Sequence, residues 1–352
     1  MMIRWNSPLR ASVLAVVALG LACSQRADPV APELWMTGSS ATSATSYSGR
    51  ATVVQATLLT LAPVTLVDAG PLPPQGGAEQ ASLLNASVPG LLTAEALHAS
   101  TIGQGNASRS EASVAELALT IGGNSVSASF LEARATAMCT DAGATASGSS
   151  DITALSVNGQ TIAISGAPNQ TVALPNGRVI INEQTSAGAG DITVNALHVV
   201  VDGVADLVIS AAHADITCAA GPPPSGCSSG DFVTGGGWIT GTPSGVKANF
   251  GAAGGRKQGA LWGHLLYIDH GTGGPRVKGT GVTAYTVVST TSRHIEGTAE
   301  VNGQDGFTYQ LDVTDNGEPG SNDIFTIQLS NGYGASGNLR GGNIQLHAPT
   351  CP

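Results

Sequence analysis

Two-residue turn signals recur along this chain between short runs of β-forming residues, and they constrain its fold more than any other feature. Asn158-Gly159, Asn176-Gly177 and Asp202-Gly203 each separate two such runs in the first half of the chain. Asn302-Gly303 and Asn331-Gly332 mark further turns in the second half. Because Asn-Gly and Asp-Gly supply the positive φ angles of type I′ turns, these pairs predict β-hairpins.

The segments around these turns are rich in Val, Ile, Thr and aromatic residues and are predicted to be strands. They are residues 152–157, 161–164, 172–174, 179–181, 194–201, 204–209, 277–288, 307–313 and 325–329. Residues 111–119 come nearest to a helical pattern, but their small and β-branched neighbours leave that segment ambiguous. Many short strands predict an all-β fold with two β-sandwich-like or barrel-like domains.

The N-terminus has the three parts of a secretory signal peptide over residues 1–22. Arg4 and Arg10 precede an uncharged run that ends in small residues, and this run is too short to span a bilayer as a stable helix. Gly20-Leu21-Ala22-Cys23 is similar to a bacterial lipobox, which predicts lipidation of Cys23. We therefore expect an exported protein, either lipid-anchored in the cell envelope or, by ordinary cleavage, secreted.

Residues beyond the signal peptide divide by composition. Residues 23–46 are polar, small and rich in Ser, Thr, Ala and Pro, which predicts a flexible tether. Residues 47–220 contain no Lys and no Trp and carry a net charge of −9, whereas residues 228–352 hold ten aromatic residues and a net charge of −2. The Pro/Gly stretch 221–227 is the predicted linker between two β domains.

The cysteines fit an oxidising compartment. Without Cys23 there remain Cys139, Cys218, Cys227 and Cys351, an even number that predicts two disulfides with three possible pairings. The linker between the middle two cysteines favours Cys139 with Cys218 and Cys227 with Cys351. Closely spaced cysteine pairs, which a zinc site needs, do not occur.

Several sequence blocks resemble one bacterial family. The blocks are ASLLNASVPGLL (81–92), ARATAMC (133–139), VNG (157–159), LPNG (174–177), INEQ (181–184) and NALHV (195–199), and they look like choice-of-anchor P proteins. DFVTGGGWI (231–239), KANFG (247–251) and GGNIQ (341–345) resemble the module that often follows that domain. The resemblance implies an exported cell-surface β protein without assigned chemistry. This chain lacks a C-terminal sorting motif, so its expected tether is Cys23.

Two apparent catalytic motifs are better explained as loops. Residues 226–230 match G-x-S-x-G, but they follow the proline linker and no predicted helix comes after them, so a nucleophile elbow is not expected. Residues 332–337 match G-x-G-x-x-G, but a strand rather than a helix follows, so a hairpin loop is expected in place of a dinucleotide site. We expect no enzyme activity and no cofactor.

Two groups of residues are the candidate binding sites, and each has a plainer alternative. Asp312, Asp315, Glu318 and Asp323 offer oxygen ligands suited to Ca²⁺, but the same residues are typical of an acidic, solvated hairpin turn. Trp238, Trp262, Tyr267 and Tyr309 form a candidate platform for stacking on sugars, but the second domain also needs such side chains for its core.

Histidines give no metal site by spacing. His198 and His213 are predicted to lie on paired strands with His213 opposite Ile192, which separates them by about 20 Å. His264 and His270 are six residues apart on one predicted strand. Satisfied or solvent-facing histidines are therefore expected.

The expected function is that of a structural or adhesive lipoprotein at the cell surface. The alternative is a secreted glycan-binding module whose binding lies in the second domain. The expected partners are a membrane, through the lipid anchor, and a cell-surface polysaccharide or protein. Because 14 basic residues face 24 acidic ones, for a net charge of −10, a nucleic-acid partner is not expected.

Overall fold

Antiparallel β-strands make up almost all of the computed structural model, which describes residues 44–59, 62–219, 230–257 and 259–349. Within these residues the only helix is a 3-10 turn, η1 (Gly320–Asn322). The prediction of an all-β fold is confirmed, and residues 111–119 lie inside a strand. The signal peptide, Cys23, the linker and the pair Cys227 and Cys351 lie outside the described residues, so predictions about them stay predictions.

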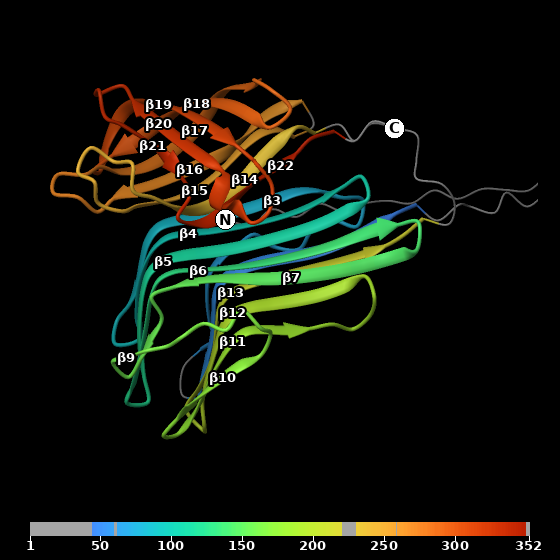
Figure 1. Ribbon diagram of the computed structural model, residues 1–352, viewed down its shortest axis with the longest axis vertical. Helices are drawn as coiled ribbons and strands as arrows, with labels where there is room; N and C mark the ends of the chain where they lie inside the picture. Colours follow the sequence, from blue (N-terminus) through green and yellow to red (C-terminus); the bar gives the residue numbers. More distant parts are fainter. Residues whose placement is uncertain (1–43, 60–61, 220–229, 258, 350–352) are drawn as a thin grey trace, which may run out of the picture. The chain divides into compact units, whose positions relative to one another are not determined.

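The strands form three sheets (Figure 1). The first has the spatial order β10 (Gln170–Leu174), β11 (Gly177–Thr185), β12 (Asp191–Val201), β13 (Ala205–Thr217), β1 (Ser46–Leu58) and β2 (Val64–Asp68). The second has the order β3 (Gly77–Val88), β4 (Leu92–Gln104), β5 (Ala107–Ile121), β6 (Asn124–Thr140), β8 (Ser156–Val157) and β9 (Gln160–Thr161), with β7 (Gly143–Thr153) also paired to β6. The third has the order β21 (Gly334–Asn338), β20 (Ile324–Leu329), β19 (Gln304–Thr314), β18 (Ser292–Val301), β17 (Arg276–Val287), β16 (Ala260–Asp269), β15 (Ala248–Lys257), β14 (Phe232–Ile239) and β22 (Gly341–His347).

The first two sheets enclose one core and so form a β-sandwich. Its fully buried side chains are Ala, Val, Leu and Ile, among them Val54 on β1, Leu131 on β6 and Leu197 on β12. Successive side chains of a strand point to opposite faces of its sheet. One face of each sheet therefore fills this core, and the other face is left for other contacts.

The third sheet, which we call the C-terminal sheet, encloses a second and more aromatic core. Phe250 stacks on Phe325 with ring centroids 3.9 Å apart, and Tyr267 and Tyr309 are buried beside them. The sheet curls so that the Ser336 N–H, on β21, donates to the carbonyl of Gly241, just after β14. The curl lets a single sheet surround its own apolar side chains.

The predicted hairpins form, with local corrections. Leu174 pairs with Gly177, so the turn there is Pro175-Asn176 and not the predicted Asn176-Gly177. Asn158-Gly159 and Asn302-Gly303 are two-residue turns with positive φ at both positions. After Asp202-Gly203, however, Val201 pairs with Ala205, so that turn has three residues. His213 consequently faces Thr193, and the predicted pairing with Ile192 is wrong by one residue.

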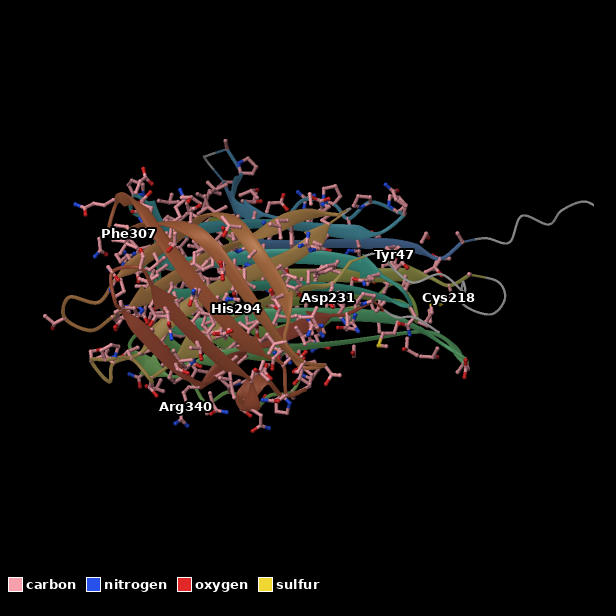
Figure 2. The ribbon with its side chains drawn as sticks, turned by 90° about the horizontal axis from the view of Figure 1, so that it is seen from above. Tyr47, Cys218, Asp231, His294, Phe307 and Arg340 are labelled. Atoms are coloured by element: carbon pink, nitrogen blue, oxygen red, sulfur yellow. A yellow bond between two sulfur atoms is a disulfide. The ribbon has the colours of Figure 1, made fainter. Side chains whose placement is uncertain are left out.

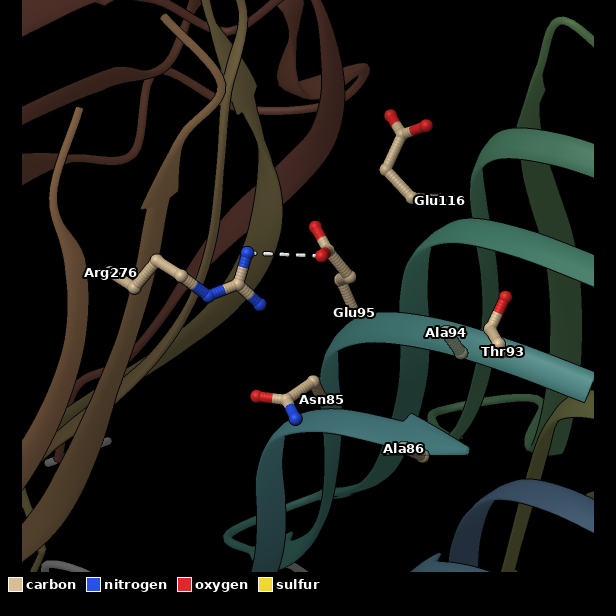
Figure 3. Close-up of a pocket in the computed structure, with 7 residues that line it drawn as sticks. All are labelled: Asn85, Ala86, Thr93, Ala94, Glu95, Glu116 and Arg276. Atoms are coloured by element: carbon tan, nitrogen blue, oxygen red, sulfur yellow. Dashed lines mark hydrogen bonds and ion pairs between the residues drawn. The ribbon is translucent and has the colours of Figure 1, made fainter. Parts of the chain in front are cut away.

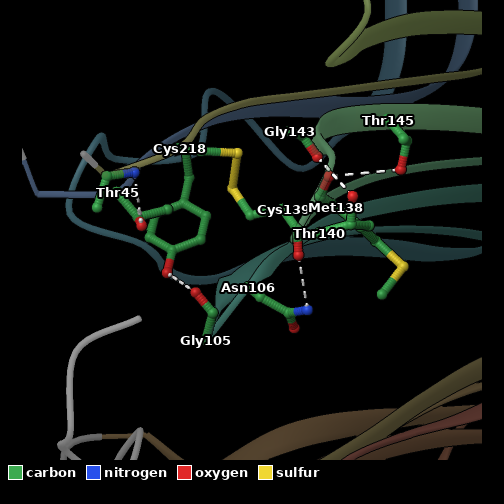
Figure 4. The surroundings of a disulfide bond; sticks show 11 residues. Thr45, Gly105, Asn106, Met138, Cys139, Thr140, Gly143, Thr145 and Cys218 are labelled. Carbon is green, nitrogen blue, oxygen red and sulfur yellow. Dashed lines mark hydrogen bonds between the residues drawn. A yellow bond between two sulfur atoms is a disulfide. The ribbon is translucent and has the colours of Figure 1, made fainter. Parts of the chain in front are cut away.

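The predicted disulfide between Cys139 and Cys218 is present, with Cα atoms 5.6 Å apart (Figure 4). It joins the end of β6 to the residue that follows β13, and so it connects the two sheets of the sandwich. Tyr47 and Cys218 lie at the same end of the molecule (Figure 2). There the Tyr47 hydroxyl donates to the Gly105 carbonyl.

Candidate functional site

The polar face of the second sheet packs against the C-terminal sheet, and we call this interface the seam. The second sheet contributes Gln80, His98, Arg109, Glu111, Ser113, Glu132, Arg134 and Asp151. The C-terminal sheet contributes Phe232, Thr234, Gly236, Trp238, Gly251, Trp262, His264, Asn343, Gln345 and His347. Because strand side chains alternate, each of these rows lies opposite a row that fills one of the two apolar cores. The seam is the largest collection of buried ionisable groups in the described residues.

Glycines let the two backbones approach each other across the seam. A Cβ atom at Gly236 would lie 2.3 Å from Oγ of Ser113, and one at Gly251 would lie 2.8 Å from Cβ of His98. The Gly342 N–H donates to the Asp151 carboxylate at 2.8 Å. The glycines at positions 236 and 251 therefore have a structural cause, which is close contact with a polar sheet.

Two histidines contact each other inside the seam. Nδ1 of His98 lies 2.9 Å from Nε2 of His264, and the other ring nitrogen of His264 bonds to Gln80. Burial lowers the pKa of His98 to about 4 and the pKa of His264 well below its usual value. Both rings are therefore neutral at physiological pH.

A buried carboxyl pair lies beside these histidines. Burial raises the pKa of Glu111 to about 7, and it raises the pKa of Glu132 well above its usual value. Arg134 opposes both shifts from 3.2 Å away from Glu132, yet neither oxygen of Glu132 accepts a hydrogen bond. We therefore assign the raised direction to both groups.

These groups do not form a nucleophile relay. Oγ of Ser113 has no hydrogen-bond partner among the described residues, and Nε2 of His98 lies 3.9 Å from Oε1 of Glu111. A Ser-His-acid relay needs the histidine hydrogen-bonded to both of the other members. Here the remaining ring nitrogen of His98 is occupied by His264.

Gly236→Ala is expected to destabilise the protein by about 1–3 kcal/mol, because the new methyl group overpacks the seam against Ser113. Chemical denaturation measures the change. Adding Ser113→Gly removes the two nearest of the three atoms that the methyl meets and should recover part of the loss in a double-mutant cycle. Gly334→Ala is the matched control, since its Cβ would meet nothing closer than 3.7 Å. Equal losses in the two alanine variants would contradict close contact at Gly236.

A groove at the edge of the seam collects ion pairs. It has a volume of about 500 Å³ and is lined by Glu95, Glu116 and Arg276 among others (Figure 3). Arg276 donates to Glu95 at 3.0 Å, and Lys247 bonds to Glu116. Ala96 and Glu116 have positive φ angles of 46°, where β4 and β5 are irregularly paired. Both carboxylates pair with cationic side chains of the C-terminal part of the chain, so the ion pairs in this groove stabilise the seam.

The acidic residues for which a calcium site and an acidic turn were the two alternatives take part in hydrogen bonds. Asp323 accepts the N–H groups of Asn316 and Ile344, and Asp315 accepts that of Leu346 at 2.9 Å. Asp312 bonds to His294 on the neighbouring strand, away from the others. Burial also raises the pKa of Asp323 to about 6, which disfavours a charged ligand.

The fourth acid, Glu318, accepts a hydrogen bond from Asn343. No group of three or more metal-ligating side chains occurs in the part of the chain that the structure describes. The carboxylates tie the loop before β20 to β22, and the calcium interpretation has no geometric support.

Asp323→Asn is expected to cost about 1–3 kcal/mol, because one of its two acceptor oxygens becomes an NH₂ group facing a buried N–H. Thermal unfolding measures the loss, and it should be the same with millimolar Ca²⁺ or with a chelator. A Ca²⁺-dependent rise in the melting temperature of the wild type that the variant lacks would restore the calcium interpretation.

The four residues of the predicted aromatic platform do not share a face. Tyr267 and Tyr309 are buried in the core of the C-terminal sheet. Trp262 contacts Phe232 in the seam, with ring centroids 5.8 Å apart. Trp238 lies 5.9 Å below Nζ of Lys247, and its indole nitrogen is buried. The predicted single platform is wrong, because core and seam divide these side chains between them.

The remaining histidines are satisfied by neighbours. His198 lies 2.9 Å from Glu183 and 3.0 Å from Asp206, and His213 lies 2.9 Å from Asp191. His270 pairs with Asn249 at 2.9 Å. These carboxylate and amide partners agree with the expectation that the histidines are satisfied by neighbouring groups.

Comparison with known proteins gives no relative: no family model matches the chain, and no curated protein or solved structure matches it either. Among the described residues, none of the helices has the length and apolar character to cross a membrane. The site is therefore judged on its own geometry.

Sequence patterns missed the seam. His98, Glu111 and Glu132 sit in strands of Ala, Ser and Thr, where no spacing sets them apart. The available signal was an excess of ionisable residues on one alternating face of residues 107–140. Such a face is predicted to be exposed to solvent unless a second sheet is known to cover it.

Proposed function

We propose that this protein is an exported structural or adhesive protein of the bacterial cell surface, without catalytic activity and tethered through lipidated Cys23. The observation that carries the proposal is the Cys139–Cys218 disulfide, because such bonds persist in oxidising, extracytoplasmic compartments. The resemblance to choice-of-anchor P proteins supports the same assignment.

The seam supports a structural role. Ion pairs from Lys247 to Glu116 and from Arg276 to Glu95 connect the C-terminal sheet to the sandwich. Lys257 adds a third pair with Glu79 at 2.9 Å. Partly buried pairs of this kind, together with close glycine packing, resist relative movement of the sheets. A stiff β body is suited to bearing load or presenting a surface.

Fractionation of cells that express the full chain tests the proposal. The wild type should be found with membranes and yield an acylated N-terminal Cys23 by mass spectrometry, whereas Cys23→Ser should be released from the membrane. A mature N-terminus elsewhere would overturn the lipid tether. Turnover of any member of a panel of esterase, peptidase and glycosidase substrates would overturn the non-catalytic role.

A further inference from the structure

A second cavity opens beside the seam, and no part of the proposed structural role uses it. Its volume is about 390 Å³, within the range of small-ligand pockets. Arg109 and Glu111 on β5 and Arg134 on β6 line one side, Ser147 lies on β7, and Glu318 and Gln345 line the other side. We call it the Arg109 pocket.

Arg109 is the unusual member of this pocket. Its Nε atom is buried and donates to no acceptor in the described part of the chain, and Arg109 forms no ion pair with any described carboxylate. Burial lowers the pKa of Arg109, and the charges of Asp315 and Glu318 oppose this shift without forming an ion pair with it. Burying a donor without an acceptor is unfavourable, so an outside group is expected to supply the acceptor.

An acceptor without a donor lies in the same pocket. Oε1 of Glu111 is buried and accepts no hydrogen bond from the described residues. Glu318 lies 3.8 Å from Arg134 on the opposite wall. Glu318 also accepts a hydrogen bond from Asn343, so it is not an unsatisfied acceptor. The pocket therefore presents one unsatisfied donor, Nε of Arg109, and one unsatisfied acceptor, Oε1 of Glu111, with nearly balanced charge.

This combination selects the ligand class. A hydroxyl group both donates and accepts, so adjacent hydroxyls can bond to Arg109 and Glu111 together. A multiply charged anion would meet Glu318 and Glu111 as well as the two arginines, and the net charge of −10 would repel it. Small hydroxyl and amide side chains, such as Ser147 and Gln345, line the remaining surface.

We propose that the Arg109 pocket binds a neutral, polyhydroxylated ligand, namely an uncharged sugar unit of a polysaccharide. The binding site lies on the sandwich side of the seam, not on the tryptophans of the C-terminal sheet. The proposal goes beyond the structural role and does not depend on how the protein is anchored.

Calorimetric titration of the full chain with neutral hexasaccharides of glucose, mannose and galactose tests the proposal. We expect at least one of them to bind. Arg109→Met, which keeps most of the side-chain volume, should weaken binding at least tenfold, and Arg109→Lys should restore little because it lacks the planar set of donors. Arg178→Met is the control, since Arg178 is exposed and lies outside the pocket.

Ser147→Leu guards against a folding defect in the arginine variants. Ser147 is exposed at the pocket, and its side chain makes no hydrogen bond within the described residues, so its replacement should block the pocket and leave the melting temperature unchanged. Parallel titrations with oligogalacturonate and with inorganic phosphate test the charge argument.

Three outcomes would overturn the proposal. The first is that no neutral hexasaccharide binds. The second is that binding survives both Arg109→Met and Ser147→Leu. The third is that only the charged probes bind. The membrane fractionation described above would be unaffected by any of them, so the two proposals fail separately.

Discussion

The double variant Cys139→Ala/Cys218→Ala is expected to be less stable than the wild type by about 4.5 kcal/mol, the value that the chain-entropy model gives for a closed loop of this length. The two cysteines are 79 residues apart in sequence. The bond restricts the unfolded chain from the end of β6 to the end of β13. In the folded state it connects two sheets that otherwise meet through their core and through hydrogen bonds such as the one from Tyr47 to Gly105. A loss of this size is a large fraction of the stability of a typical protein.

Equilibrium urea denaturation measures the loss, with the reduced wild type as the first comparison. Reduction should reproduce most of the effect of the double variant. Cys227→Ala/Cys351→Ala is the second comparison, and it should lose a similar amount only if those two cysteines are also paired, which peptide mapping checks directly. A loss below about 1 kcal/mol for Cys139→Ala/Cys218→Ala would contradict the entropic argument.

Hairpins were predictable because the information for them is local. Asn158-Gly159 and Asn302-Gly303 adopt the positive φ angles that their residue types favour. The turn after Val201 was predicted one residue too short, and that error displaced the expected partner of His213. Register depends on turn length, and Val204 extends this turn without a glycine or asparagine to signal it.

The seam was not predictable because its partners are far apart in sequence. His98 and His264 are separated by 166 residues in sequence. Ser113 lies on the second sheet, and Gly236, which it contacts, lies on the C-terminal sheet. A polar face on an alternating strand is predicted to be exposed to solvent, because the sequence alone does not show that a second sheet covers it. The same reason explains why the sequence did not show which aromatic side chains lie in the core and which lie in the seam. Trp238 and Tyr267 differ only in which face of the C-terminal sheet they occupy.

Glu111→Gln is expected to change how the stability of the protein depends on pH. The folded-state pKa of Glu111 is about 7, above the usual value of 4.5 for the unfolded chain. A raised pKa contributes stability that is fully present below the unfolded value and lost as pH rises through the folded value. Between those two values the wild type therefore loses on the order of 3 kcal/mol from this group, at about 1.4 kcal/mol per pKa unit.

The groups facing Glu111 set the size and direction of this effect. Burial is the largest cause of the raised pKa of Glu111, and the charge of Glu318 adds to it. Arg134, Glu132 and the Gly236 N–H favour the charged form of Glu111, and His98 is neutral at the pH values concerned. Glutamine cannot ionise, so the variant should keep its stability where the wild type loses it. At about pH 5, where Glu111 is protonated, the two proteins should be closest in stability.

Urea denaturation at a series of pH values from about 5 to about 8.5 gives the free energy of unfolding for each protein. The difference between Glu111→Gln and the wild type should move in favour of the variant as pH rises, by on the order of 3 kcal/mol in total. Glu300→Gln, on β18 outside the seam, removes a carboxylate without touching these contacts and serves as the control. The buried histidines act in the opposite direction, since their lowered pKa values remove stability as pH falls, but they are common to all three proteins. Parallel pH profiles for Glu111→Gln and the wild type would show that the buried carboxyl pair ionises as freely as it does in water.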